Sequence, residues 1–237
     1  MTASSAMNDT RLVVTHLIGM YRRVALWFCG ALIVGTAIAV TVLAMVTEVR
    51  YSMWVLIAGS AVKYWQAVVG VLLVSTHLRQ FVSTGVTRHA FLRGAALFGL
   101  WSAVFLAALV VAGHAVEQAL IRLDGPLIPT YPRLDAGGLV TEFLHVLPTE
   151  LAYLVAGAAI AAGFYRYGAL PGSLLIVPCL LPVAVTEGLL GRGPHGETLT
   201  RFLPFGVALT LALVAIALVA TIFHRELRDA AIRRAAG

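Results

Sequence analysis

The sequence predicts an all-α, polytopic membrane protein with six transmembrane helices. Of its 237 residues, 60% are hydrophobic and 12% are charged, whereas ordinary soluble domains have about 25% charged residues. The apolar residues gather into runs of about 20, which as helix are long enough to cross roughly 30 Å of hydrocarbon. A soluble domain could not bury this much apolar surface, so we expect the runs to lie in a membrane.

Charge and cysteine content exclude two other classes of protein. The net charge is +6, but the arginines lie at the ends of apolar runs, where they determine membrane topology. We therefore expect no nucleic-acid partner. Cys29 and Cys179 both lie inside apolar runs, and neither a disulfide framework nor a zinc-type spacing can be built from them.

The six predicted spans form one domain, residues 1–237. They cover residues 24–46, 53–76, 94–116, 144–164, 169–186 and 202–223. Residues 1–23 precede them as an interfacial segment, because apolar residues of 11–21 share one helical face and Arg22 and Arg23 follow. Residues 224–237 form a cationic tail that suits anionic lipid headgroups.

The distribution of positive charge predicts the orientation. Of the 17 Lys and Arg residues, eleven fall on the side of the two termini, five fall on the opposite side, and Lys63 lies within a span. Cytoplasmic segments carry the excess of Lys and Arg. We therefore expect a multi-pass protein of the bacterial cytoplasmic membrane with both termini in the cytoplasm.

Prolines mark two irregular regions. Residues 117–143 contain Pro126, Pro129 and Pro132, which predict a non-helical lid or crossing outside the membrane. The fifth span holds Pro171, Pro178 and Pro182. We expect that span to be kinked or partly re-entrant and to pack against protein, because carbonyl groups freed by proline need partners.

A short polar segment, residues 77–93, separates the second and third spans and is called the elbow below. Leu78, Phe81 and Val82 form its apolar face. Gly85 can adopt the left-handed conformation that ends a helix, and Thr87 can cap the next one. The pattern predicts a rigid helical elbow at the membrane surface.

Polar residues inside the spans are the candidates for a pathway or for buried pairs. Lys63 lies near the middle of the second span, where a charge is expensive unless it faces a partner or a cavity. Lys63 could pair with Glu150 or Glu187 inside the bundle. Alternatively, Lys63 and Gln66 could line a substrate path.

Motifs for bond chemistry are absent from the sequence. His114, Glu117, Glu142, His145 and Glu150 gather at the outer ends of the third and fourth spans, but no zincin motif frames them, and we expect no metal site. No GxSxG segment is present. The phosphate-binding motif GxxxxGK[ST] needs a lysine after glycine, and the only lysine follows Val62. We therefore expect no catalytic residue, and any ATP-driven work must come from another subunit.

The elbow sequence FVSTGVTRHAFLRG resembles the first cytoplasmic loop of type-2 ABC exporter permeases, where GVTR or GVSR precedes an aromatic residue. The short YRYG turn between the fourth and fifth spans and the broken fifth span also resemble that family. The resemblance implies a permease that pairs with a second permease copy or a homologous permease. It also implies an ABC ATP-binding subunit that binds ATP and Mg²⁺, so that this chain would bind no cofactor itself.

In that family the elbow is a cytoplasmic coupling helix that docks on the ATP-binding subunit. Carried over to this sequence, the resemblance implies that the contact is made by Gln80, Phe81, Thr84, Gly85, Val86, Thr87, Arg88 and Phe91. The candidates for the pathway or for buried polar pairs are Lys63, Gln66, Glu150 and Glu187. Two alternatives stay open, an integral-membrane enzyme that modifies lipid and a membrane scaffold subunit without a pathway. The sequence does not identify the substrate.

Overall fold

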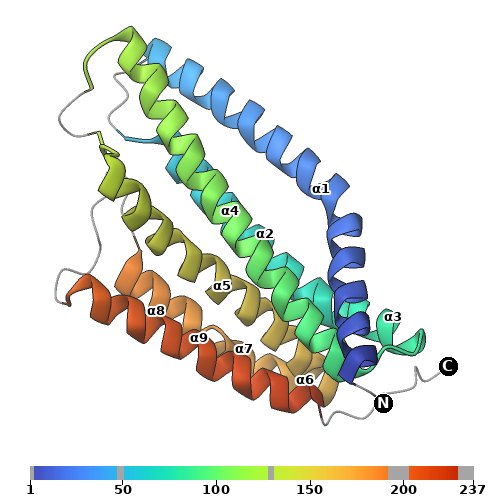
Figure 1. Cartoon of the computed structure of the whole chain (residues 1–237). Coiled ribbons are helices and arrows are strands. Elements are labelled where there is room, and N and C mark those ends of the chain that lie inside the picture. Colours follow the sequence, from blue (N-terminus) through green and yellow to red (C-terminus); the bar gives the residue numbers. More distant parts are fainter. Residues whose placement is uncertain (1–2, 47–50, 128–130, 192–202, 229–237) are drawn as a thin grey trace.

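The structure is a computed structural model that describes residues 3–46, 51–127, 131–191 and 203–228, and the regular structure in these residues is helical (Figure 1). Five helical stretches are long and apolar enough to span a membrane. These are Met7–Leu43, Met53–Ser83, Arg88–Leu123, Gly137–Tyr167 and Phe205–Leu227. The predicted multi-pass, all-α architecture is thus present, whereas the count of six spans is not confirmed.

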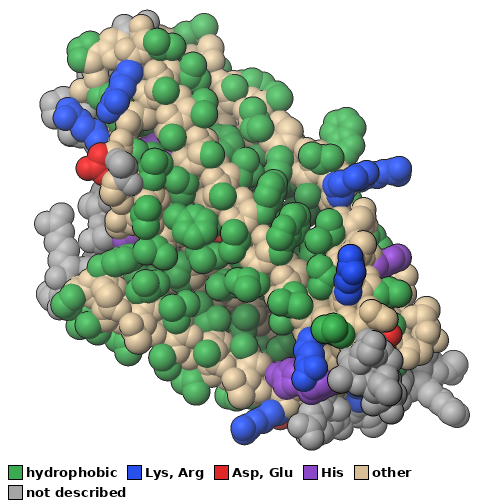
Figure 2. Space-filling view, viewed as in Figure 1, with side chains coloured by type: hydrophobic (Ala, Val, Ile, Leu, Met, Phe, Trp, Pro, Cys, Tyr) green, Lys and Arg blue, Asp and Glu red, His purple; other side chains and the backbone are tan. Residues whose placement is uncertain are grey.

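The central helix is α5 (Ala136–Tyr167). One side of α5 packs against α2 (Met53–Leu72) and α4 (Arg88–Asp124), and the other side packs against α8 (Leu181–Leu190) and α9 (Phe205–Arg228). The long α1 (Ala3–Val46) covers α4 and α2 from outside (Figure 1). Hydrophobic side chains cover the middle of the face in Figure 2, and Lys and Arg side chains gather toward its two ends, as the bilayer requires.

Glycines allow α2 and α5 to pack at backbone distance. A Cβ atom on Gly70 would fall onto the carbonyl oxygen of Leu154, and one on Gly157 would fall onto the carbonyl oxygen of Ala67. Small residues at such a crossing let two membrane helices approach closely, which increases their van der Waals contact. This contact fixes how close α2 and α5 lie to each other.

The predicted interfacial segment, residues 1–23, is not a separate helix in the described part, because α1 is continuous from Ala3 to Val46 and bends in Figure 1; its place at the membrane interface stays a prediction. Val13 and Leu17 are fully buried in the same hydrophobic cluster as Phe81 and Phe91. Gly94 leaves the space that Val13 fills. The apolar stripe of this segment therefore packs against the elbow and not only against lipid.

The prediction of a long non-helical loop at residues 117–143 is also wrong. Helix α4 continues to Asp124, and α5 begins at Ala136, where the side chain of Asp135 accepts a hydrogen bond from the backbone N–H of Gly138. Pro126 and Pro132 act only locally, because each one removes a single donor and restricts its immediate neighbours, and Pro129 lies outside the described residues. Only residues 125–135 separate the two helices.

The predicted fifth span consists of three short helices, α6 (Ala169–Leu174), α7 (Ile176–Cys179) and α8. Pro171, Pro178 and Pro182 each lie within the first three residues of their helix, where the missing N–H has no intrahelical acceptor to lose. The expected kink is present, whereas packing of this segment against protein is not confirmed, because Leu170, Leu174 and Val177 are exposed on the single chain. The loop that follows, residues 192–202, lies outside the described residues.

Helices α6, α7 and α8 carry the chain from the elbow end of the bundle back to the opposite end, where Leu190 contacts His145. Helices α5 and α9 run in the same direction, because Arg166 meets Glu226 at one end while the rings of His145 and Phe205 meet at the other. The start of α1 and the end of α9 lie at the elbow end, where the rings of His89 and His224 are 5.7 Å apart (Figure 1). Of the predicted tail, the structure describes only residues 224–228.

The glycine contact between α2 and α5 can be tested with two substitutions on the same helix. Gly70→Ala should destabilise the fold by about 1–3 kcal/mol, because its Cβ forces the two helix backbones apart. Gly59→Ala is the control, since nothing lies within 4 Å of the Cβ position there. The measurement is reversible unfolding of the purified protein in detergent. Equal stability of the two variants would contradict this packing.

Candidate functional site

The elbow is a rigid connection between α2 and α4. Helix α2 continues through a π-helical turn, η1 (Leu73–His77), into α3 (Leu78–Ser83). Gly85 has a φ of 94°, and the backbone N–H of Val86 donates to the carbonyl of Phe81 at 3.1 Å, which closes the helix end. The hydroxyl of Thr87 accepts a hydrogen bond from the backbone N–H of Ala90 at 3.3 Å. The predicted helix stop and helix cap are therefore both present.

A separate coupling helix between the second and third spans is not confirmed. The second span does not stop at residue 76, because the π-helical turn keeps the backbone hydrogen-bonded and the helix runs on to Ser83. Only residues 84–87 separate this helix from α4. The elbow is thus a tight helix–turn–helix whose two arms are the ends of spanning helices.

The eight elbow candidates divide into two groups by exposure. Phe81 and Phe91 are 5% and 1% exposed, and their rings lie 5.5 Å apart in the hydrophobic core. Their predicted role as direct contacts does not fit this burial, so they can only hold the elbow in shape. The other six form its accessible surface. Gln80, Thr84 and Gly85 are exposed, and Val86, Thr87 and Arg88 are partly buried.

Inside the bundle, the structure pairs Lys63 of α2 with Glu187 of α8. The Lys63 Nζ atom lies 2.6 Å from Glu187 Oε1, and the hydroxyl of Tyr153 donates to the same oxygen at 3.2 Å. The pair therefore joins α2, α5 and α8. Gln66 takes a different partner, because its amide donates to the hydroxyl of Ser102 on α4 at 3.2 Å, away from Lys63.

A cavity of about 190 Å³ lies between α2, α4, α5 and α8. Its polar lining comes from Ser60, Lys63, Glu142, His145, Thr149, Glu150 and Glu187, and its apolar lining includes Val55, Val110, Val146 and Leu190. Glu150 is 1% exposed. The structure thus brings three of the four predicted polar candidates, Lys63, Glu150 and Glu187, to one cavity.

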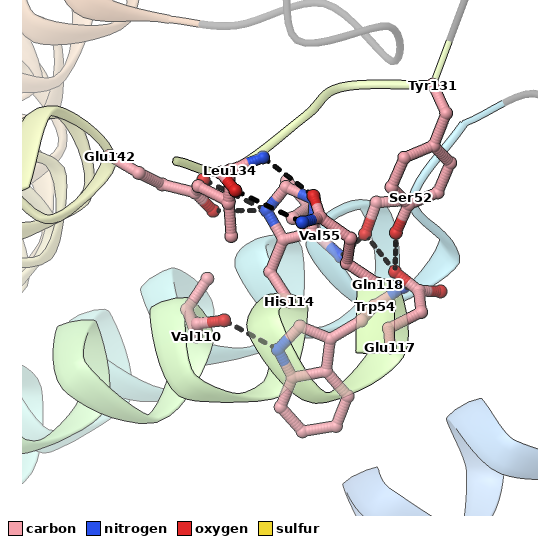
Figure 3. Close-up of polar contacts among 10 residues, drawn as sticks. All are labelled: Ser52, Trp54, Val55, Val110, His114, Glu117, Gln118, Tyr131, Leu134 and Glu142. Carbon is pink, nitrogen blue, oxygen red and sulfur yellow. Dashed lines mark hydrogen bonds and ion pairs between the residues drawn. The ribbon is translucent and has the colours of Figure 1, made fainter. Parts of the chain in front are cut away.

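A second polar group, the Glu117 cluster (Figure 3), lies at the start of α2, the end of the bundle opposite the elbow. The carboxylate of Glu117 accepts hydrogen bonds from the hydroxyl of Ser52, from the backbone N–H of Trp54 at 3.2 Å and from the hydroxyl of Tyr131 at 3.0 Å. The backbone N–H belongs to the first turn of α2, where a negative charge is favourable. Burial and the Glu117 carboxylate raise the pKa of Tyr131, so its hydroxyl remains a donor.

Sequence reasoning missed Ser52, Trp54 and Tyr131. Ser52 had a recognisable signal, because a serine directly before an apolar run is a common helix cap, and its hydroxyl accepts from the backbone N–H of Val55 at 3.1 Å. Tyr131 had none, because its contact with Glu117 depends on how the segment before α5 folds back. Gln118 reinforces that fold by binding both the N–H and the carbonyl of Leu134 (Figure 3).

The five His and Glu residues of the alternative enzyme reading do not converge on one point. Nδ1 of His114 lies 2.9 Å from the carboxylate of Glu142, His145 Nδ1 lies 2.9 Å from the carbonyl oxygen of Leu190, and Glu117 has the partners given above. In the described ranges, no three His, Cys, Asp or Glu residues are arranged to hold a metal ion. The contacts of His114 with Glu142 and of His145 with Leu190 therefore join neighbouring helices, and Glu142, His145 and Glu150 also line the cavity described above.

Comparison with known proteins leaves the family open. Family models, curated proteins and solved structures all gave no match to this chain. The similarity to type-2 ABC exporter permeases therefore stays a prediction from the elbow motif, and the site is interpreted from its own geometry.

The strength of the Lys63–Glu187 pair can be measured with a double-mutant cycle of Lys63→Met and Glu187→Gln. We expect a favourable coupling of about 0.5–3 kcal/mol in unfolding experiments, because each single variant leaves a charged partner in the bundle. Arg166→Met with Glu226→Gln is the matched control at the elbow end, where about 0–1 kcal/mol is expected. A coupling no larger than that of the control would show that the Lys63 pair is not a structural contact.

Loss of the Tyr131 hydroxyl should loosen the segment before α5. We expect Tyr131→Phe to speed amide hydrogen exchange in residues 131–135 by about tenfold or more, because a hydrogen bond to a charged acceptor is worth about 1.5–3 kcal/mol. Exchange at the elbow end should stay unchanged. Tyr153→Phe provides a control that removes a tyrosine hydroxyl from a different carboxylate. Equal exchange of residues 131–135 in Tyr131→Phe and wild type would contradict the cluster.

Proposed function

We propose that this chain is the transmembrane permease subunit of a bacterial ABC exporter, working with a second permease and driven by separate ATP-binding subunits. The observation that supports this function best is the capped elbow. It joins α2 and α4 rigidly and presents a polar surface at one end of the bundle. The permease itself performs no bond chemistry and binds no cofactor, and ATP and Mg²⁺ belong to its partner.

The elbow is mechanically connected to the polar cavity. The helix from Lys63 to Ser83 has no break, since α2, η1 and α3 are contiguous, and it spans about 30 Å. A displacement at the elbow therefore moves Lys63 relative to Glu187 on α8. Because α8 follows two helix breaks, it can shift without bending a long helix. Opening and closing of the cavity is the step that this arrangement couples to a partner.

The partner surface comprises the exposed and partly buried tip residues Gln80, Thr84, Gly85, Val86, Thr87 and Arg88. Phe81 and Phe91 anchor this tip to the core. Val13 and Leu17 of α1 pack in the same cluster. The N-terminal part of α1 thus stiffens the elbow against the force that an ATP-binding subunit would apply.

Six crossings with cytoplasmic termini suit this function. The return of the chain through α6, α7 and α8, between the parallel helices α5 and α9, supports a sixth passage. The excess of Lys and Arg in the segments of the elbow end supports a cytoplasmic elbow. The exposed apolar residues of α6 and α7 would then face lipid or the second permease.

The proposed docking can be tested with bulky substitutions at exposed positions. Thr84→Trp, at the elbow tip, should reduce co-purification of the ATP-binding subunit encoded beside this chain at least about tenfold, because the added ring blocks close contact there. Thr141→Trp, exposed at the opposite end of the bundle, is the control. Both variants should insert and unfold like wild type. If no ATP-binding subunit co-purifies with wild type, or if Thr84→Trp retains it fully, the proposed function is wrong.

A further inference from the structure

Glu150 is a buried carboxyl group without a complete set of partners. Its side chain lies on the wall of the cavity between α2, α4, α5 and α8 and is 1% exposed. Within the described ranges, its Oε2 atom has no hydrogen-bond partner. A buried acceptor that makes no hydrogen bond is costly, so the cavity offers an unused binding group.

The charges around Glu150 indicate what it can bind. Lys63 is the nearby cation, but its ammonium group is already paired with Glu187 at 2.6 Å, and the hydroxyl of Tyr153 also serves Glu187. Glu150 is thus a second carboxyl group beside a cation that is already neutralised. A ligand with a positive charge and at least one hydrogen-bond donor would satisfy Oε2 and stabilise Glu150 as a carboxylate.

We propose that this cavity is a binding site for a protonated amine, whose ammonium group donates a hydrogen bond to Oε2 of Glu150. Thr149 and Ser60 line the same cavity and offer hydroxyl oxygens as further acceptors for the three donors of an ammonium group. The identification of amines as the transported class rests on the proposed function. The binding site itself does not.

The rest of the cavity fits the hydrocarbon part of such a ligand. Its volume is about 190 Å³, and Val55, Val110, Val146 and Leu190 form its apolar wall. An apolar cavity of about 150 Å³ is sufficient for benzene. Benzylammonium therefore matches the site in size, charge and polarity. An anion does not, because carboxyl groups dominate the polar lining.

The test is a binding experiment on the full chain in lipid nanodiscs, without any ATP-binding subunit. Isothermal titration calorimetry compares benzylammonium with benzyl alcohol, which is neutral and of similar size, and empty nanodiscs correct for partitioning into lipid. Benzylammonium should bind wild type at least about tenfold more tightly than benzyl alcohol does. Glu150→Gln should weaken benzylammonium binding at least about tenfold, whereas Glu226→Gln, at the elbow end, should leave it unchanged.

Two results would overturn the site. One is equal affinity of wild type for benzylammonium and benzyl alcohol. This comparison needs only wild-type protein, so it tests the site even if Glu150→Gln fails to fold. The other is unchanged benzylammonium binding in a folded Glu150→Gln protein, in which case Glu150 only carries its own proton. Amine binding without association of an ATP-binding subunit would keep the site and reject the proposed function. Association of an ATP-binding subunit without amine binding would keep the proposed function and reject the amine site.

Discussion

The backbone contact between α2 and α5 at Gly70 and Gly157 is the constraint on which the rest of the bundle depends. Because neither glycine has a side chain, the two helices approach more closely than other residues would allow. Helix α5 then becomes the centre of the molecule, with α2 and α4 on one side and α8 and α9 on the other. The polar cavity with Lys63, Glu150 and Glu187 lies beside this pair of helices.

This arrangement explains why charged residues are tolerated inside the bundle. Lys63 of α2 reaches Glu187 of α8, and Tyr153 of α5 completes the contact, so the charge of Lys63 has a partner within the bundle. Glu150 is the exception, because the cation nearest to it is already paired. A buried carboxyl group with an unsatisfied oxygen lowers the stability of the folded protein, and a ligand that donates a hydrogen bond to it would restore that stability.

The two ends of α2 are held in different ways. At one end the Glu117 cluster joins α2, α4 and the segment before α5 through hydrogen bonds. At the other end the elbow is held by apolar packing of Phe81, Phe91, Val13 and Leu17. Apolar contacts lack the directional restraint of hydrogen bonds, so the rigid elbow can shift as one unit against the helices around it while the Glu117 end stays in register. This asymmetry suits a helix that transmits motion from the elbow to the cavity.

The sequence by itself determined the membrane class, the long apolar helices, and the stop and cap of the elbow. These features depend on local composition and on backbone preferences, as at Gly85 and Thr87. The tertiary structure decided the rest. It paired Lys63 with Glu187 and not with Glu150, buried Phe81 and Phe91, and brought Tyr131 to Glu117. Those outcomes depend on which helix faces meet, and a linear pattern does not contain that information.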